Sequence, residues 1–183
     1  MKNILILFMV LNNSFLIAQN TTTTKARTLL ENASLVKIAK DWNTTAFLLS
    51  GNGETVSFIP IEITDLKTNE VVQALQVEMT TNCRGYKYFE ISYIDVDEIE
   101  GIVKYLETYV EPKMSKRTDL KKSNSYVYKT KEIKISFTIG YSTNKLEVYC
   151  KNKEDYNEQC FFWTESLSSK AQELLTVLKS FNY

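Results

Sequence analysis

The sequence predicts an α+β fold in which an antiparallel β-sheet of hairpins and meanders packs against two amphipathic helices. Runs of β-branched and aromatic residues recur between polar turns along residues 35–93 and 125–164. Residues 95–111 and 167–181 instead carry apolar side chains at spacings of three and four, the pattern of a helix with one buried face. Because each helix follows a group of strands, the order is typical of an α+β domain.

The first eighteen residues predict an export signal. Lys2 precedes an apolar run over 4–11, which is shorter than the roughly 20 residues that a bilayer-spanning helix needs. Ala18 is a small residue that a signal peptidase accepts before its cut. We therefore expect 1–18 to be a cleaved signal peptide and the protein to be secreted or periplasmic, with no transmembrane segment in the mature chain. The alternative is a buried N-terminal strand or helix.

Residues 19–34 are expected to form a flexible polar leader with a possible short helix near its end, because threonines and asparagines open this stretch and apolar residues at helical spacing follow. Residues 35–183 are expected to be a single α+β domain. Within it, residues 46–111 and 124–183 read as two similar strands-then-helix halves, since positions 72 residues apart pair Phe89 with Phe161. Two interpretations stay open, a duplication of one unit and a coincidence of spacing.

The elements follow in chain order from local pattern. The apolar runs predict strands at 35–39, 46–49, 55–59, 61–63, 71–79, 86–93, 125–129, 131–141, 145–150 and 159–164. The Asn52-Gly53 pair suits a tight hairpin turn, because both residue types tolerate positive φ. Asp97 and Glu100 predict a capping box at the start of the first long helix, and Pro112 predicts its end.

Composition restricts the chemistry. The chain has 22 basic and 22 acidic residues, so without Lys2 it carries a charge of about −1, which argues against nucleic-acid binding through phosphates. The chain contains no histidine, and this excludes Ser-His-Asp and Cys-His nucleophile systems and histidine-containing zinc sites. Carboxylate, lysine, tyrosine or cysteine chemistry remains. No motif calls for a cofactor.

Three cysteines in an oxidising compartment allow at most one internal disulfide. Cys150 and Cys160 flank a polar stretch between two predicted strands, so they are the expected pair, which leaves Cys83 with a free thiol. The alternative is that these cysteines are unpaired and act as small apolar residues.

Asp95, Asp97, Glu98 and Glu100 form the densest acidic group. Carboxylate oxygens are ligands for a hard cation such as calcium, but acids at a helix start are also expected from capping and from the helix dipole. Capping is the favoured interpretation.

A separate group of tyrosines along the strands predicts cross-strand pairing or, if several share an exposed face, a platform for sugar or peptide. These are Tyr86, Tyr88, Tyr93, Tyr126, Tyr128, Tyr141, Tyr149 and Tyr156.

The sequence therefore leads to a hypothesis of a non-enzymatic exported binding or protein-interaction module, and we lean against an enzyme. Its expected partner is an envelope or extracellular protein, or a glycan. One alternative is a carboxylate-dependent hydrolase acting on glycan or cell-wall material, since such enzymes need only two acids. Another is a structural or assembly component of the envelope that pairs through exposed strand edges.

Overall fold

The computed structural model of the chain describes residues 23–116, 122–141, 144–152, 155–165 and 167–181. The predicted signal peptide at 1–18 lies outside these ranges. Within them, two antiparallel sheets and three α-helices confirm the predicted α+β class.

The first sheet has the strand order β1-β3-β4-β5, with β2 also paired to β3. Its strands are β1 (Val36–Lys40), β2 (Ala46–Leu49), β3 (Thr55–Asp65), β4 (Val71–Cys83) and β5 (Tyr86–Asp95). We expected two strands around Pro60, but β3 continues through it. Pro60 lies where the neighbour of β3 changes from β2 to β1, so the amide hydrogen that proline lacks is not needed for a regular ladder there.

The second sheet has the order β10-β8-β7-β6, and a short β9 pairs with β8. Its strands are β6 (Asn124–Lys129), β7 (Ile133–Ile139), β8 (Asn144–Asn152), β9 (Asp155–Tyr156) and β10 (Phe162–Thr164).

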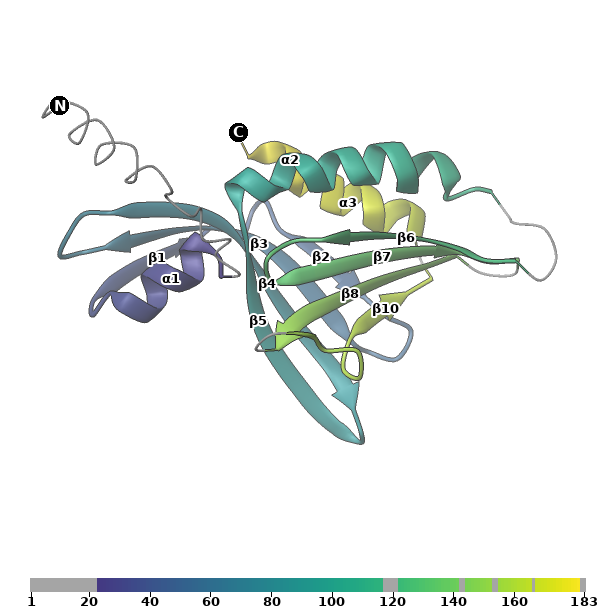
Figure 1. Cartoon of the computed structure of the whole chain (residues 1–183), viewed down its shortest axis with the longest axis horizontal. Helices are drawn as coiled ribbons and strands as arrows, with labels where there is room; N and C mark the ends of the chain where they lie inside the picture. The colour runs from purple at the N-terminus through teal and green to yellow at the C-terminus, as the bar shows by residue number, and fades with distance from the viewer. Residues whose placement is uncertain (1–22, 117–121, 142–143, 153–154, 166, 182–183) are drawn as a thin grey trace, which may run out of the picture.

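The helices are α1 (Lys25–Asn32), α2 (Val96–Tyr105) and α3 (Leu167–Ser180). The α2 helix continues through one π-helical turn (Leu106–Val110) and one 3-10 turn (Glu111–Lys113). In Figure 1, α2 and α3 lie side by side along one border of the molecule, whereas α1 lies against the far end of the first sheet.

Two hydrophobic clusters hold these elements together. The larger one contains buried side chains from α2, α3 and both sheets, including Phe58, Ile102, Phe137 and Leu174. The smaller one lies under α1, where Ala26 and Leu29 contact the odd-numbered face of β3. The region of the predicted polar leader thus contributes an ordered helix at 25–32 with its own buried contacts.

Aromatic side chains fix α2 against β6. Tyr105 lies 5.6 Å from Tyr128 between ring centroids, and its hydroxyl donates a 2.8 Å hydrogen bond to the carbonyl of Tyr126. The Tyr128 ring passes over Gly101 so closely that a Cβ at Gly101 would overlap the Tyr128 hydroxyl and lie 2.9 Å from its Cζ. Glycine is therefore required in the middle of α2 by a close approach.

The close approach predicts the effect of a methyl group at Gly101. In an exposed helix, glycine to alanine gains about 1 kcal/mol, but Gly101→Ala should lower the free energy of unfolding by about 1–3 kcal/mol because the Tyr128 ring must move. In a Tyr128→Phe background the same substitution should cost clearly less. Urea denaturation measures both changes, and stabilisation by Gly101→Ala in the wild-type background would contradict the packing.

Candidate functional site

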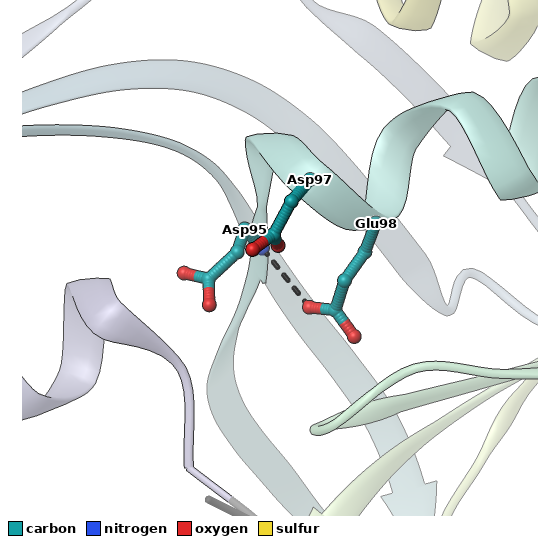
Figure 2. Close-up of side chains that lie close together, drawn as sticks. All are labelled: Asp95, Asp97 and Glu98. Carbon is teal, nitrogen blue, oxygen red and sulfur yellow. Dashed lines mark hydrogen bonds between the residues drawn. The ribbon is translucent and has the colours of Figure 1, made fainter. Parts of the chain in front are cut away.

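Three of the four predicted acids meet where β5 ends and α2 begins (Figure 2). Asp95, Asp97 and Glu98 each place a carboxylate oxygen within 4.8 Å of the others. Glu100 is not in this group and is exposed on α2.

Asp95 is 1% exposed, and its carboxylate binds groups from two other elements. Both oxygens accept from the backbone N–H of Lys25, the first residue of α1, at 2.9 Å. One of them also pairs with Lys131 Nζ at 2.7 Å. Asp95 therefore joins the end of β5 to the N-terminus of α1 and to the turn between β6 and β7.

Glu98 uses its two oxygens in the same way. One accepts from the backbone N–H of Asp95 at 3.1 Å and the other from the backbone N–H of Lys131 at 2.7 Å. The predicted cap at Asp97 with Glu100 is therefore wrong: Asp95 is the N-cap residue and Glu98 its capping-box partner, because β5 extends to Asp95 and the helix starts one residue later.

Asp97, the exposed member, forms ion pairs with Lys25 at 2.8 Å and Lys131 at 3.8 Å. The hydrogen bond from Lys25 lowers the pKa of Asp97, whereas burial raises the pKa of Glu98. A cation at this place would have to displace donors that the three carboxylates already bind. The geometry supports the favoured capping interpretation and adds helix docking to it.

The sequence pattern did not identify Glu132 as a candidate residue, yet its carboxylate accepts hydrogen bonds from more donors than any predicted acid does. Its side chain is 5% exposed. It accepts from Thr24 Oγ1 at 2.7 Å, from Arg27 Nε at 2.9 Å and Nη2 at 2.7 Å, and from the backbone N–H of Tyr93 at 3.0 Å. Arg27 also donates to the carbonyl of Ile91 at 3.1 Å. The Arg27–Glu132 pair thus satisfies the backbone of β5 along the edge that has no neighbouring strand.

We call this group of side chains the docking network; it consists of Thr24, Lys25, Arg27, Asp95, Asp97, Glu98, Lys131 and Glu132. Burial alone would raise the pKa of Glu132, but the hydrogen bonds from Arg27 and Thr24 outweigh it, so the pKa lies below its ordinary value of 4.5. Glu132 is therefore ionised at neutral pH.

Side chains also cover one other sheet edge. On β2, the backbone N–H of Phe47 donates to Glu173 at 2.8 Å and its carbonyl accepts from Lys170 at 3.1 Å, both residues belonging to α3. These contacts occupy backbone groups that could otherwise pair with another chain.

The predicted disulfide is wrong. Cys160 bonds to Cys83, with Cα atoms 5.2 Å apart, and the free cysteine is Cys150. Cys150 is fully buried in the core face of β8, whereas Cys160, in the loop before β10, reaches the end of β4, where Arg84 also contacts Gln159. Burial raises the pKa of Cys150 to about 12, so it is a thiol at neutral pH and not a nucleophile.

The tyrosines do not gather on one exposed face. Tyr93 and Tyr149 are buried, while Tyr126 packs against α2. On the outer face of the second sheet, Tyr149 stacks on Phe161 with centroids 4.6 Å apart, but Lys134 Nζ lies 3.6 Å from the centre of the Tyr149 ring. The chain's own lysine thus occupies a ring face that a sugar would need.

A depression of about 600 Å³ opens between β1, β3, β4 and the C-terminal end of α3. Its walls combine carboxylates, an amide, hydroxyls, an ammonium and apolar surface, from Ala39, Lys40, Asp41, Thr44, Pro60, Ile61, Glu62, Gln73, Ser180 and Phe181. Hydrogen bonds from the Thr44 hydroxyl and the Asn43 amide lower the pKa of Asp41. No local motif marks these residues, because they come from β1, the loop after it, β3, β4 and the C-terminal end of α3.

Comparison with protein-family models, with curated proteins and with solved structures gives no significant match to this chain. Among the described residues, no helix is both long enough and apolar enough to cross a membrane. The candidate site therefore rests on the chain's own geometry.

Glu132→Gln tests the docking network. Removing the charge from a buried, hydrogen-bonded pair should lower the free energy of unfolding at pH 7 by roughly 2–4 kcal/mol. The folded pKa of Glu132 is depressed, so its contribution is complete above 4.5 and is lost as the pH falls through the folded pKa. The difference between wild type and variant should therefore shrink in acid. Glu100→Gln, at an exposed position of the same region, is the matched control; equal effects of the two substitutions would refute the role of Glu132.

The disulfide makes a separate prediction. Alkylation of the unfolded, unreduced protein followed by peptide mass mapping should label Cys150 alone. In the folded protein Cys150 should react slowly, because it is 0% exposed and protonated. Label on Cys83 or Cys160 without prior reduction would exclude the bond between them.

Proposed function

We propose that the protein is an exported, non-enzymatic binding module that holds a glycan in the depression beside β1. The observation that carries this proposal is the composition of the walls, where the polar side chains of Asp41, Glu62 and Gln73 line the same space as the aromatic ring of Phe181.

The chemistry of a sugar fits such walls. A sugar ring presents several hydroxyls, each of which donates and accepts hydrogen bonds, and a patch of C–H groups. Carboxylates accept from two hydroxyls at once, and an amide both donates and accepts. An aromatic ring offers an apolar surface to the C–H patch.

Export is part of the same proposal. The charge, apolar run and small residue at 1–18 predict a signal peptide. The Cys83–Cys160 bond supports it, because disulfides persist in the periplasm and outside the cell and are rare in the cytosol. A secreted or periplasmic module meets polysaccharides in either place.

We also propose that the fold is a duplication, with each strands-then-helix half contributing one amphipathic helix to a common layer. In the first half, β2 to β5 precede α2; in the second, β6, β7, β8 and β10 precede α3. Equal numbers of main antiparallel strands before each helix support this interpretation. The end of α3 then forms one wall of the depression.

A glycan hydrolase is the second candidate, because the depression holds two carboxylates. Hydrolysis needs one carboxylic acid that keeps its proton near neutral pH and therefore has a raised pKa. The pKa of Asp41 is lowered instead, and the carboxyls with raised pKa values, Glu90 and Glu98, do not line the depression. This chemistry favours binding over bond cleavage.

The third candidate, assembly through strand edges, is limited by the covered edges of β2 and β5.

Isothermal titration with N-acetylglucosamine oligomers, cello-oligosaccharides and muropeptides tests the binding proposal. An open depression buries only part of a ligand, so we expect a dissociation constant of about 1 mM for the best probe. Phe181→Ala and Gln73→Ala should each weaken binding, while Phe89→Ala, an exposed aromatic outside the depression, should not. Absence of binding across the panel, or binding unchanged in Phe181→Ala, would reject the site; release of shorter sugars would favour the hydrolase.

A further inference from the structure

The described side chains leave the outer edge of β1 uncovered. Its ladder with β3 continues at both ends through hydrogen bonds from Leu66 N–H to the Leu35 carbonyl at 3.0 Å and from Asp41 N–H to the Pro60 carbonyl at 2.9 Å. Odd-numbered residues of β1 therefore direct their backbone groups toward β3. Because the direction alternates along a strand, Val36, Ile38 and Lys40 direct theirs outward.

No other group in the described part of the chain bonds to these outward N–H and C=O groups. The edges of β2 and β5, by contrast, each have backbone groups bonded to side chains from another element. The three central residues of β1 are exposed, and Ile38 is 43% exposed. An exposed edge with an apolar side chain can accept another strand.

We propose that two copies of this chain associate by pairing their β1 strands antiparallel, about a two-fold axis that passes beside Ala39. The proposal goes beyond glycan binding and does not depend on it. The proposed partner is a second copy of this chain, because in this register charged residues of one β1 face residues of opposite charge on the other β1.

The outward groups restrict the choice of register. Even-numbered residues must face even-numbered residues of the second copy to exchange hydrogen bonds, so the axis passes beside a single residue. An axis at Lys37 or at Lys40 sets that lysine against its own copy, which is unfavourable. An axis at Ile38 pairs no opposite charges. An axis at Ala39 sets Lys37 opposite Asp41 on both sides.

The two charges are available for this contact. Lys37 and Asp41 are both exposed, and neither forms an ion pair with another described residue. The lowered pKa of Asp41 keeps it ionised. In the proposed register the two residues form a pair without direct hydrogen bonds between their backbones, the arrangement in which facing side chains come closest. Two such ion pairs form in each dimer.

The register also has consequences for the depression. Ala39, at the axis, and Asp41, two residues from it, both line the depression, so the depressions of the two copies become neighbours across the new strand pair. A dimer would then present two adjacent sugar sites to one polysaccharide chain. Two adjacent weak sites raise the overall affinity without any new contact to the sugar.

Reciprocal charge exchange tests the register. Sedimentation equilibrium of the purified protein, up to about 1 mM, should detect a dimer, because a small interface has a dissociation constant in the micromolar to millimolar range. Lys37→Glu and Asp41→Lys should each weaken self-association by about tenfold or more, since each sets like charges opposite one another. An equimolar mixture of the two variants should restore dimers. In the mixed dimer the two substituted side chains face each other with opposite charges, and the native Asp41 of one copy faces the native Lys37 of the other.

Two further variants complete the experiment. Ile38→Pro removes an N–H that points away from β3, so it should block pairing while circular dichroism shows an intact fold. Lys87→Glu, at an exposed position of β5, is the matched charge control and should leave dimerisation unchanged. A strict monomer throughout the concentration range would overturn the proposal and assign Lys37 the role of keeping the edge unpaired. A dimer that survives Ile38→Pro, or a mixture that stays monomeric, would overturn it as well.

Discussion

Two buried carboxylates, Asp95 and Glu132, hold this fold together where its separate parts meet. A buried carboxylate is stable only if hydrogen-bond donors replace the water it loses. Here the donors come from the first turn of α1, from the edge of β5 and from the turn before β7. Satisfying the two charges therefore brings together a helix, the first sheet and a hairpin of the second. The smaller hydrophobic cluster under α1 is kept closed by the same contacts.

The same way of satisfying polar groups recurs at the sheet edges. Arg27 and Glu132 bond to the backbone of β5 where a further strand would lie, and Lys170 and Glu173 do so on β2. A charged pair thus supplies one donor and one acceptor in place of a neighbouring strand. This keeps long strands from pairing with other chains. β1 differs from these two edges, because no described side chain bonds to its outward backbone groups.

Local pattern predicted the α+β class, most strands and the positions of α2 and α3, because these depend on the alternation and spacing of apolar residues. It could not choose the cap of α2, since Asp95 with Glu98 and Asp97 with Glu100 both fit the same motif. It also could not find Glu132, whose bond to Thr24 spans 108 residues, or the pairing of Cys83 with Cys160 across 77. Such contacts depend on how distant elements pack. Local pattern could not predict the depression for the same reason.

Native-state hydrogen exchange tests the role of the buried carboxylates most directly. The amide of Tyr93 lies on an edge strand and has only the Glu132 carboxylate as its acceptor, and the amide of Lys25 bonds to Asp95. We expect both amides to be protected nearly as well as those in the centre of β4, and to exchange through one shared opening. Exchange of Tyr93 at the rate of a free amide, while β4 stays protected, would contradict the account.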